Sequence, residues 1–82
     1  MHGSKLFVKY IDNSVSLDEI TALFLPFGDI RDIKLLNDRG IAFIEMERQM
    51  DAEKAMKELN RLQFHGKTLQ VKEATTIKVK RR

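Results

Sequence analysis

The chain has 82 residues and a mass of 9.6 kDa, enough for one small domain. It contains no cysteine, which excludes a disulfide framework, thiolate metal sites and thiol nucleophiles, and no apolar run approaches the ~20 residues of a membrane-spanning helix. These exclusions favour an intracellular protein that does not cross a membrane. The formal net charge is +3, but without the segment 75–82 the chain carries 11 basic and 12 acidic residues. The basic character therefore belongs to the end of the chain and not to its body.

The N-terminal part of the chain predicts a strand followed by a helix. Residues 1–4 carry no pattern and are interpreted as a cloning remnant. Residues 5–11 alternate β-forming side chains, as expected of a strand. One side of this strand carries Leu6, Val8 and Tyr10, and the other side carries Phe7 and Lys9. Ser16 and Glu19 have the spacing of a capping box, and the helix that they begin should end at Pro26 and Gly28.

The rest of the chain predicts a hairpin, a second helix and a last strand. Residues 30–36 and 41–47 are read as antiparallel strands, because the Asn-Asp-Arg-Gly turn between them tolerates positive φ. Asp51 leads a second amphipathic helix that extends to Leu59. A turn over 64–67 precedes a strand over 68–72.

The element order β-α-β-β-α-β predicts an α+β fold of the ferredoxin-like class. In that fold a four-stranded antiparallel sheet, with strand order 4-1-3-2, packs on two helices through one face only. Alternation along the two central strands places six side chains on the open face: Phe7, Lys9, Arg39, Ile41, Phe43 and Glu45. Two exposed phenylalanines on neighbouring strands are costly unless something stacks on them. The alternative is a shifted register in which they belong to the core, but that shift would expose Leu6 and Val8.

Two segments of the chain match motifs of a known family. Leu6-Phe7-Val8-Lys9-Tyr10-Ile11 fits the shorter ribonucleoprotein motif, and Arg39-Gly40-Ile41-Ala42-Phe43-Ile44-Glu45-Met46 fits the longer one. With these motifs in order, residues 5–74 resemble an RNA recognition motif domain, and the basic tail 75–82 follows it. The resemblance implies a single-stranded RNA-binding module within a larger RNA-processing protein, with the nucleus as the expected compartment.

The departures from the family pattern are also informative. Ile41 stands where the longer motif usually has an aromatic residue, so two of three stacking platforms remain, and Met46 replaces an aromatic residue that points to the core. Tyr10 stands where the family often has Asn, and Arg61 where it often has Gly. Glu45 on the open face should repel phosphate.

The resemblance and the alternation together predict the residues that bind RNA. Phe7 and Phe43 would stack bases, and Ile41 would contact the sugar between them. Contacts to phosphates are assigned to Lys9, Arg39 and, in the tail, to Lys78, Lys80 and Arg81, and contacts to base edges to Gln70 and Lys72. For the charged residues the alternative is ordinary solvated surface charge. The tail has a second interpretation as well, because Ile77 and Val79 alternate with lysines and could extend a strand.

Two other classes of function, a protein-interaction module and an enzyme, are the alternatives to RNA binding. The near-neutral body also fits a protein-interaction module that uses its helical face or a tail-mediated dimer, although a monomer is the default expectation. No enzyme is predicted, because acylphosphatase-like hydrolases of this topology need an Arg after the first strand, where this chain has Asp12-Asn13-Ser14. His2 and His65 are isolated in the sequence, so no metal site is predicted, and no cofactor.

Overall fold

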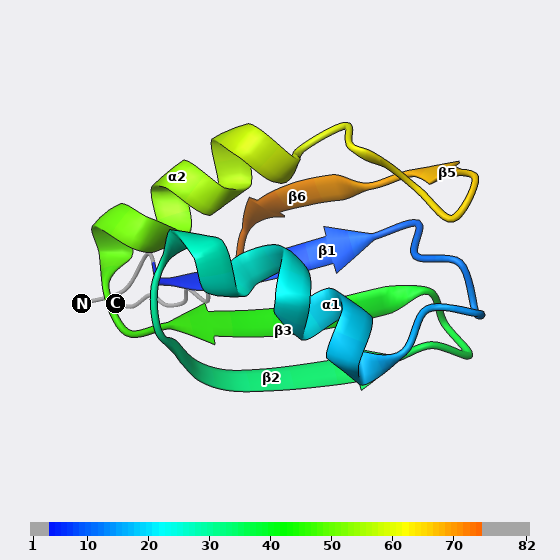
Figure 1. The fold of residues 1–82 in the computed structure, drawn as a ribbon, viewed down its shortest axis with the longest axis horizontal. Helices are drawn as coiled ribbons and strands as arrows, with labels where there is room; N and C mark the ends of the chain where they lie inside the picture. Colours follow the sequence, from blue (N-terminus) through cyan, green and yellow to red (C-terminus); the bar gives the residue numbers. More distant parts are fainter. Residues whose placement is uncertain (1–3, 75–82) are drawn as a thin grey trace, which may run out of the picture.

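The computed structural model describes residues 4–74, which form a four-stranded sheet covered on one face by two helices, and a small two-stranded hairpin (Figure 1). The main elements are β1 (Lys5–Lys9), α1 (Leu17–Phe24), β2 (Ile30–Leu36), β3 (Ile41–Met46), α2 (Gln49–Leu59) and β6 (Gln70–Glu73). Three shorter elements are the 3₁₀ turn η1 (Leu25–Phe27) and the two-residue strands β4 (Gln63–Phe64) and β5 (Lys67–Thr68). The four long strands are antiparallel in the order β2-β3-β1-β6, which confirms the predicted fold class. The tail 75–82 and residues 1–3 lie outside the described residues.

Local sequence signals account for the first helix and the hairpin. The Ser16 hydroxyl accepts the backbone N–H of Glu19, and the Glu19 carboxylate accepts the backbone N–H of Ser16, so the predicted capping box begins α1. The turn between β2 and β3 is the predicted 37–40 segment. Its last residue, Gly40, has φ +68°, and a Cβ there would lie 3.0 Å from the carbonyl oxygen of Ile11. Glycine is therefore required both by the turn and by the close approach of the loop that follows β1.

The core lies between the sheet and the helices. From the strands it takes Leu6, Val8, Ala42, Ile44, Met46 and Val71, and from the helices Ile20, Phe24, Ala52, Ala55 and Leu59. The two alanines of α2 are fully buried, because a small side chain lets this helix approach the sheet closely. Met46 is buried, as predicted from the alternation. Within residues 4–74 there is no helix long and apolar enough to cross a membrane.

The end of β1 and the start of α2 differ from the prediction. β1 ends at Lys9, because Tyr10 adopts φ +64° and turns the chain out of the sheet. Tyr10 is 57% exposed and Ile11 is buried, so the prediction that Tyr10 faces inward with Leu6 and Val8 was wrong. α2 begins at Gln49 and not at Asp51, because Arg48 takes the N-cap position without a side-chain capping bond and so gives no sequence signal.

The predicted last strand is divided in two. Residues 67–68 form β5, which pairs with β4 in a small hairpin, and only β6 joins the main sheet beside β1. Leu69 separates the two strands, since its N–H donates to Leu62 (2.9 Å) and its carbonyl accepts the N–H of Arg61 (2.8 Å). These bonds draw the chain toward the end of α2 and away from the sheet.

Candidate nucleic-acid interface

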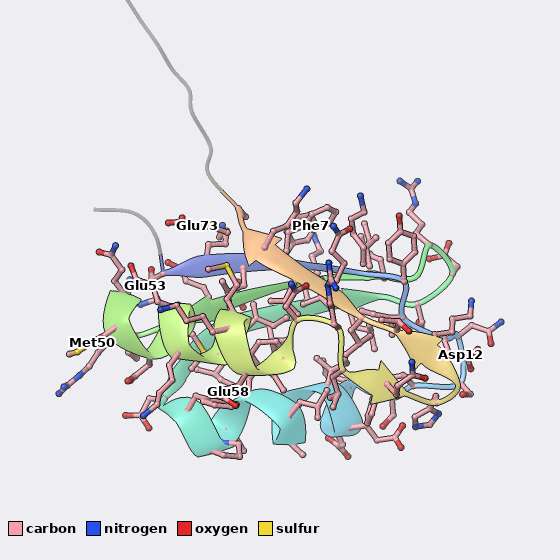
Figure 2. The ribbon with its side chains drawn as sticks, turned by 90° about the horizontal axis from the view of Figure 1, so that it is seen from above. Phe7, Asp12, Met50, Glu53, Glu58 and Glu73 are labelled. Carbon is pink, nitrogen blue, oxygen red and sulfur yellow. The ribbon has the colours of Figure 1, made fainter. Side chains whose placement is uncertain are left out.

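The open face of the sheet carries a pair of phenylalanines at its centre. Phe7 and Phe43 are direct partners across β1 and β3, so their side chains project from the same face. Their ring centroids lie 5.0 Å apart with an interplanar angle of 20°. Figure 2 shows Phe7 on the side of the sheet opposite the helices. The predicted register is therefore the observed one, and both rings are half-exposed instead of buried in the core.

A lysine stands on each side of this pair. Lys34 of β2 is the partner of Phe43, and Lys72 of β6 is the partner of Phe7, so one row across the sheet reads Lys34-Phe43-Phe7-Lys72. We call it the central row. Both lysines are exposed, and within residues 4–74 the only salt bridges are Arg31–Glu47 and His65–Glu19. The two ammonium groups of the central row are thus available to an anionic ligand.

The rows on either side differ in charge. Toward the 37–40 turn the next row is Leu36, Ile41, Lys9 and Gln70. On the other side it is Asp32, Glu45 and Lys5. A hollow of about 530 Å³ opens beside Phe43, between Lys34 and these two carboxylates. The row with two carboxylates is unfavourable for phosphate, whereas the central row and the row of Ile41 combine apolar, basic and amide groups.

The structure brings together most of the residues predicted to bind RNA. Phe7, Lys9, Ile41, Phe43, Gln70 and Lys72 share the open face. Arg39 does not join them, because it lies in the 37–40 turn, outside β3 and beyond the row of Ile41. Lys78, Lys80 and Arg81 lie outside the described residues. Sequence reasoning missed Lys34 and Leu36, although the alternation along 30–36 already placed Lys34 opposite Ile33 and Leu35.

A second polar cluster joins the β4–β5 turn to the start of α1. The His65 ring lies 2.9 Å from the Glu19 carboxylate through Nε2 and 2.9 Å from the Ser14 hydroxyl through Nδ1. The prediction that His65 is isolated was therefore wrong. The fold brings its ring into contact with Glu19 and Ser14, which lie 46 and 51 residues away in the sequence. The Ser14 hydroxyl donates to Asp12, which fixes Ser14 as part of a structural network. No group of three metal-ligating side chains occurs within the described part of the chain.

This cluster predicts a pH dependence of stability. The Ser16 backbone N–H and then the His65 side chain donate to Glu19 and lower the pKa of its carboxyl below 4.5. A carboxylate whose pKa is lower in the folded state contributes stability that is present above the unfolded-state pKa and is lost as pH falls through the folded-state value. We expect Glu19→Gln to reduce the free energy of unfolding at pH 7, and the difference from wild type to shrink below about pH 4.5. Urea unfolding at pH 7 and pH 2.5 measures this.

Glu58 provides the control for that experiment. Its exposed side chain on α2 makes no hydrogen bond or salt bridge to residues 4–74, so Glu58→Gln should leave the pH profile unchanged. A Glu19→Gln deficit that stays constant down to pH 2.5 would contradict the role assigned to the charged carboxylate.

The chain matches known proteins over most of its length. Among curated relatives, the serine/arginine (SR)-type shuttling mRNA binding protein NPL3 of Saccharomyces cerevisiae is 34% identical over 71 residues, which are 87% of this chain and 17% of NPL3. The chain spans between 8% and 26% of the curated relatives compared. Two solved structures superimpose with a TM-score of 0.87. The third RNA recognition motif of Pes4 is 30% identical and covers 95% of this chain and 99% of its own. A Sex-lethal protein–RNA complex is 28% identical, and the match covers 93% of this chain and 49% of the Sex-lethal chain.

The family model of the RNA recognition motif matches residues 6–70. That range includes both ribonucleoprotein motifs, the stacked phenylalanines and the paired strands that present them. The chain therefore belongs to the RNA recognition motif family.

Proposed function

We propose that this domain binds single-stranded RNA across the open face of its sheet. The observation that carries the proposal is the central row. In it two stacked phenylalanines stand between two lysines that form no salt bridge to residues 4–74, on a face that neither helix covers. Unpaired bases splay onto such a sheet and stack on its aromatic rings, whereas bases within a duplex do not. The similarity to a protein whose structure was solved with RNA supports the same proposal.

Each row has a distinct role in this proposal. Phe7 and Phe43 stack two bases, and the lysines of the central row contact the phosphates beside them. Lys72, which the sequence assigned to a base edge, is proposed here as a phosphate contact because it is the partner of Phe7 in that row. Ile41 packs against a sugar, and Gln70 offers its amide to a base edge. The carboxylates of Asp32 and Glu45 repel phosphate, so the RNA strand follows the central row and the row of Ile41.

The lysines are needed on energetic grounds as well. Two stacking platforms supply roughly 2–6 kcal/mol, which is less than the ~8 kcal/mol of micromolar binding. The difference must come from contacts to phosphates and base edges. We expect the isolated domain to bind with modest affinity, and the basic segment 75–82 to add phosphate contacts.

We also infer that the domain serves RNA processing within a longer protein, supported by the small share of its relatives' length that it spans. A nuclear location of that protein remains a prediction on family grounds, and imaging the tagged full-length protein tests it.

Amide chemical shifts during an RNA titration test the proposal. Short single-stranded RNA should shift the amides of β1, β2, β3 and β6, because these strands carry the central row and its neighbours. A hairpin duplex RNA of similar charge is the control and should shift them less. Shifts confined to α1 and α2 would place RNA on the helical face, and no shifts at all would favour the alternative of a protein partner on that face. Either result would contradict RNA binding on the sheet.

A further inference from the structure

A second hollow lies at the edge of the open face, where β1 ends. It has a volume of about 400 Å³, within the range of small-ligand sites, and its lining is Tyr10, Asn60, Arg61, Thr68, Leu69 and Gln70. Gln70 belongs both to this hollow and to the row of Ile41, where it pairs with Lys9. The hollow is therefore continuous with the face that we propose binds RNA.

The two positions at which the sequence departs from its family in this region meet in this hollow. Tyr10 has φ +64° and Arg61 has φ +73°, a conformation that asparagine and glycine adopt most easily. The other non-glycine residue with positive φ in 4–74 is His65, which with Gly66 forms the two-residue turn between β4 and β5. No two-residue hairpin turn of this kind accounts for the positive φ of Tyr10 or Arg61. Both side chains are thus kept at positions where the backbone favours smaller residues, as occurs at binding sites.

The side chains of the hollow are suited to a nucleotide. Tyr10 is 57% exposed, and the Lys9 ammonium lies 5.5 Å from the centre of its ring. Arg61 is exposed and makes no salt bridge to residues 4–74, while its backbone is held by the 2.8 Å bond to Leu69. An accessible aromatic ring, a guanidinium and the Gln70 amide match the base plane, the phosphate and the base edge of one nucleotide.

The position of the hollow also fits the path of the RNA. Tyr10 follows Phe7 by three residues, so their Cα atoms are separated by at most about 11 Å. The face has lost one stacking platform at Ile41, and Tyr10 lies just beyond that row. We propose that Tyr10 and Arg61 form a third nucleotide subsite, in which a base stacks on Tyr10 and its phosphate contacts Arg61. This inference rests on the proposed function and extends the bound strand past the two phenylalanines.

Two variants separate binding from folding. Tyr10→Asn and Arg61→Gly each remove the binding group and install a residue that suits positive φ, so the free energy of unfolding should stay the same or rise. Affinity for a homopolymeric hexanucleotide, chosen as the tightest of the A, C, G and U series, should fall by about 5- to 150-fold for Tyr10→Asn. Affinity for the corresponding dinucleotide should not change, because two bases occupy only the phenylalanines. Tyr10→Phe, which keeps the ring, should bind as wild type does.

The single tyrosine of the chain gives a direct signal, since its ring protons form one spin system in a protein without tryptophan. The hexanucleotide should move these resonances upfield, whereas the dinucleotide should not. Three results would overturn the subsite. The first is a Tyr10→Asn variant that binds the hexanucleotide as tightly as wild type, and the second is a Tyr10 ring signal that does not move at saturation. The third is an equal loss of affinity for both RNA lengths together with a lower free energy of unfolding. If neither RNA length shifts the amides of Phe7 and Phe43 in the wild-type protein, the proposed function itself fails.

Discussion

Replacing Phe7 or Phe43 with alanine is expected to weaken binding to short single-stranded RNA by about 5- to 150-fold. Each ring offers one stacking platform at the centre of the open face, and no other aromatic ring occupies the rows of paired residues around it. The rings also stack on each other, so each single variant disturbs the remaining platform. The double variant should therefore lose less binding free energy than the sum of the losses of the two single variants. Fluorescence anisotropy with a labelled hexanucleotide measures the losses.

Phe64 and a conservative substitution provide the controls. Phe64 of β4 packs against the core away from the open face, so Phe64→Ala should lower stability and leave RNA affinity intact. Phe43→Tyr keeps the aromatic plane and should retain most of the affinity. Unchanged affinity in both Phe7→Ala and Phe43→Ala would exclude stacking on the central row as the mode of binding.

Removing both lysines of the central row is expected to change the salt dependence of RNA binding. Each phosphate contact to a single strand contributes a slope of about 0.7 in a plot of log affinity against log salt concentration. Lys34→Gln/Lys72→Gln should therefore make the slope shallower by about 1.4 and lower the affinity at 0.1 M salt by roughly 25-fold. Titrations at four salt concentrations between 0.05 and about 0.4 M, a range in which the linear law applies, give both numbers.

The chain offers a matched control of equal charge. Lys54 and Lys57 are exposed on α2, the helix on the opposite side of the sheet, and Lys54→Gln/Lys57→Gln changes the net charge by the same amount. This variant should keep the wild-type slope. Equal slopes for the two double variants would mean that the lysines act only through net charge and not through phosphate contacts on the face.

The sequence predicted the fold and the centre of the site because both depend on local, periodic signals. Alternation fixed which side of β1 and β3 carries Phe7 and Phe43, and the capping box and the 37–40 turn defined the ends of elements. The central row required one further step. Lys34 alternates correctly in the sequence, but only the strand register shows that it stands beside Phe43.

The sequence could not predict features that depend on backbone turns or on distant contacts. Tyr10 continues the alternation of β1, and no neighbouring residue announces that its φ becomes positive and turns its ring out of the core. His65 meets Glu19 only after the sheet has closed. The division of the last strand follows from hydrogen bonds between Leu69 and the end of α2, which are also nonlocal.

The tight turn between β2 and β3 has a consequence for kinetics. Its four residues are closed by bonds from Arg39 to Leu36 (3.0 Å) and from Gly40 to Asn37 (3.3 Å), and Gly40 abuts Ile11. This turn is too short to fold over a bound strand, so the release of RNA does not require the turn to open. With association at 10⁵–10⁷ M⁻¹s⁻¹, a micromolar complex dissociates at roughly 0.1–10 s⁻¹. Such a domain samples RNA in brief encounters, and a neighbouring RNA-binding module in a longer chain would set the dwell time through effective concentration.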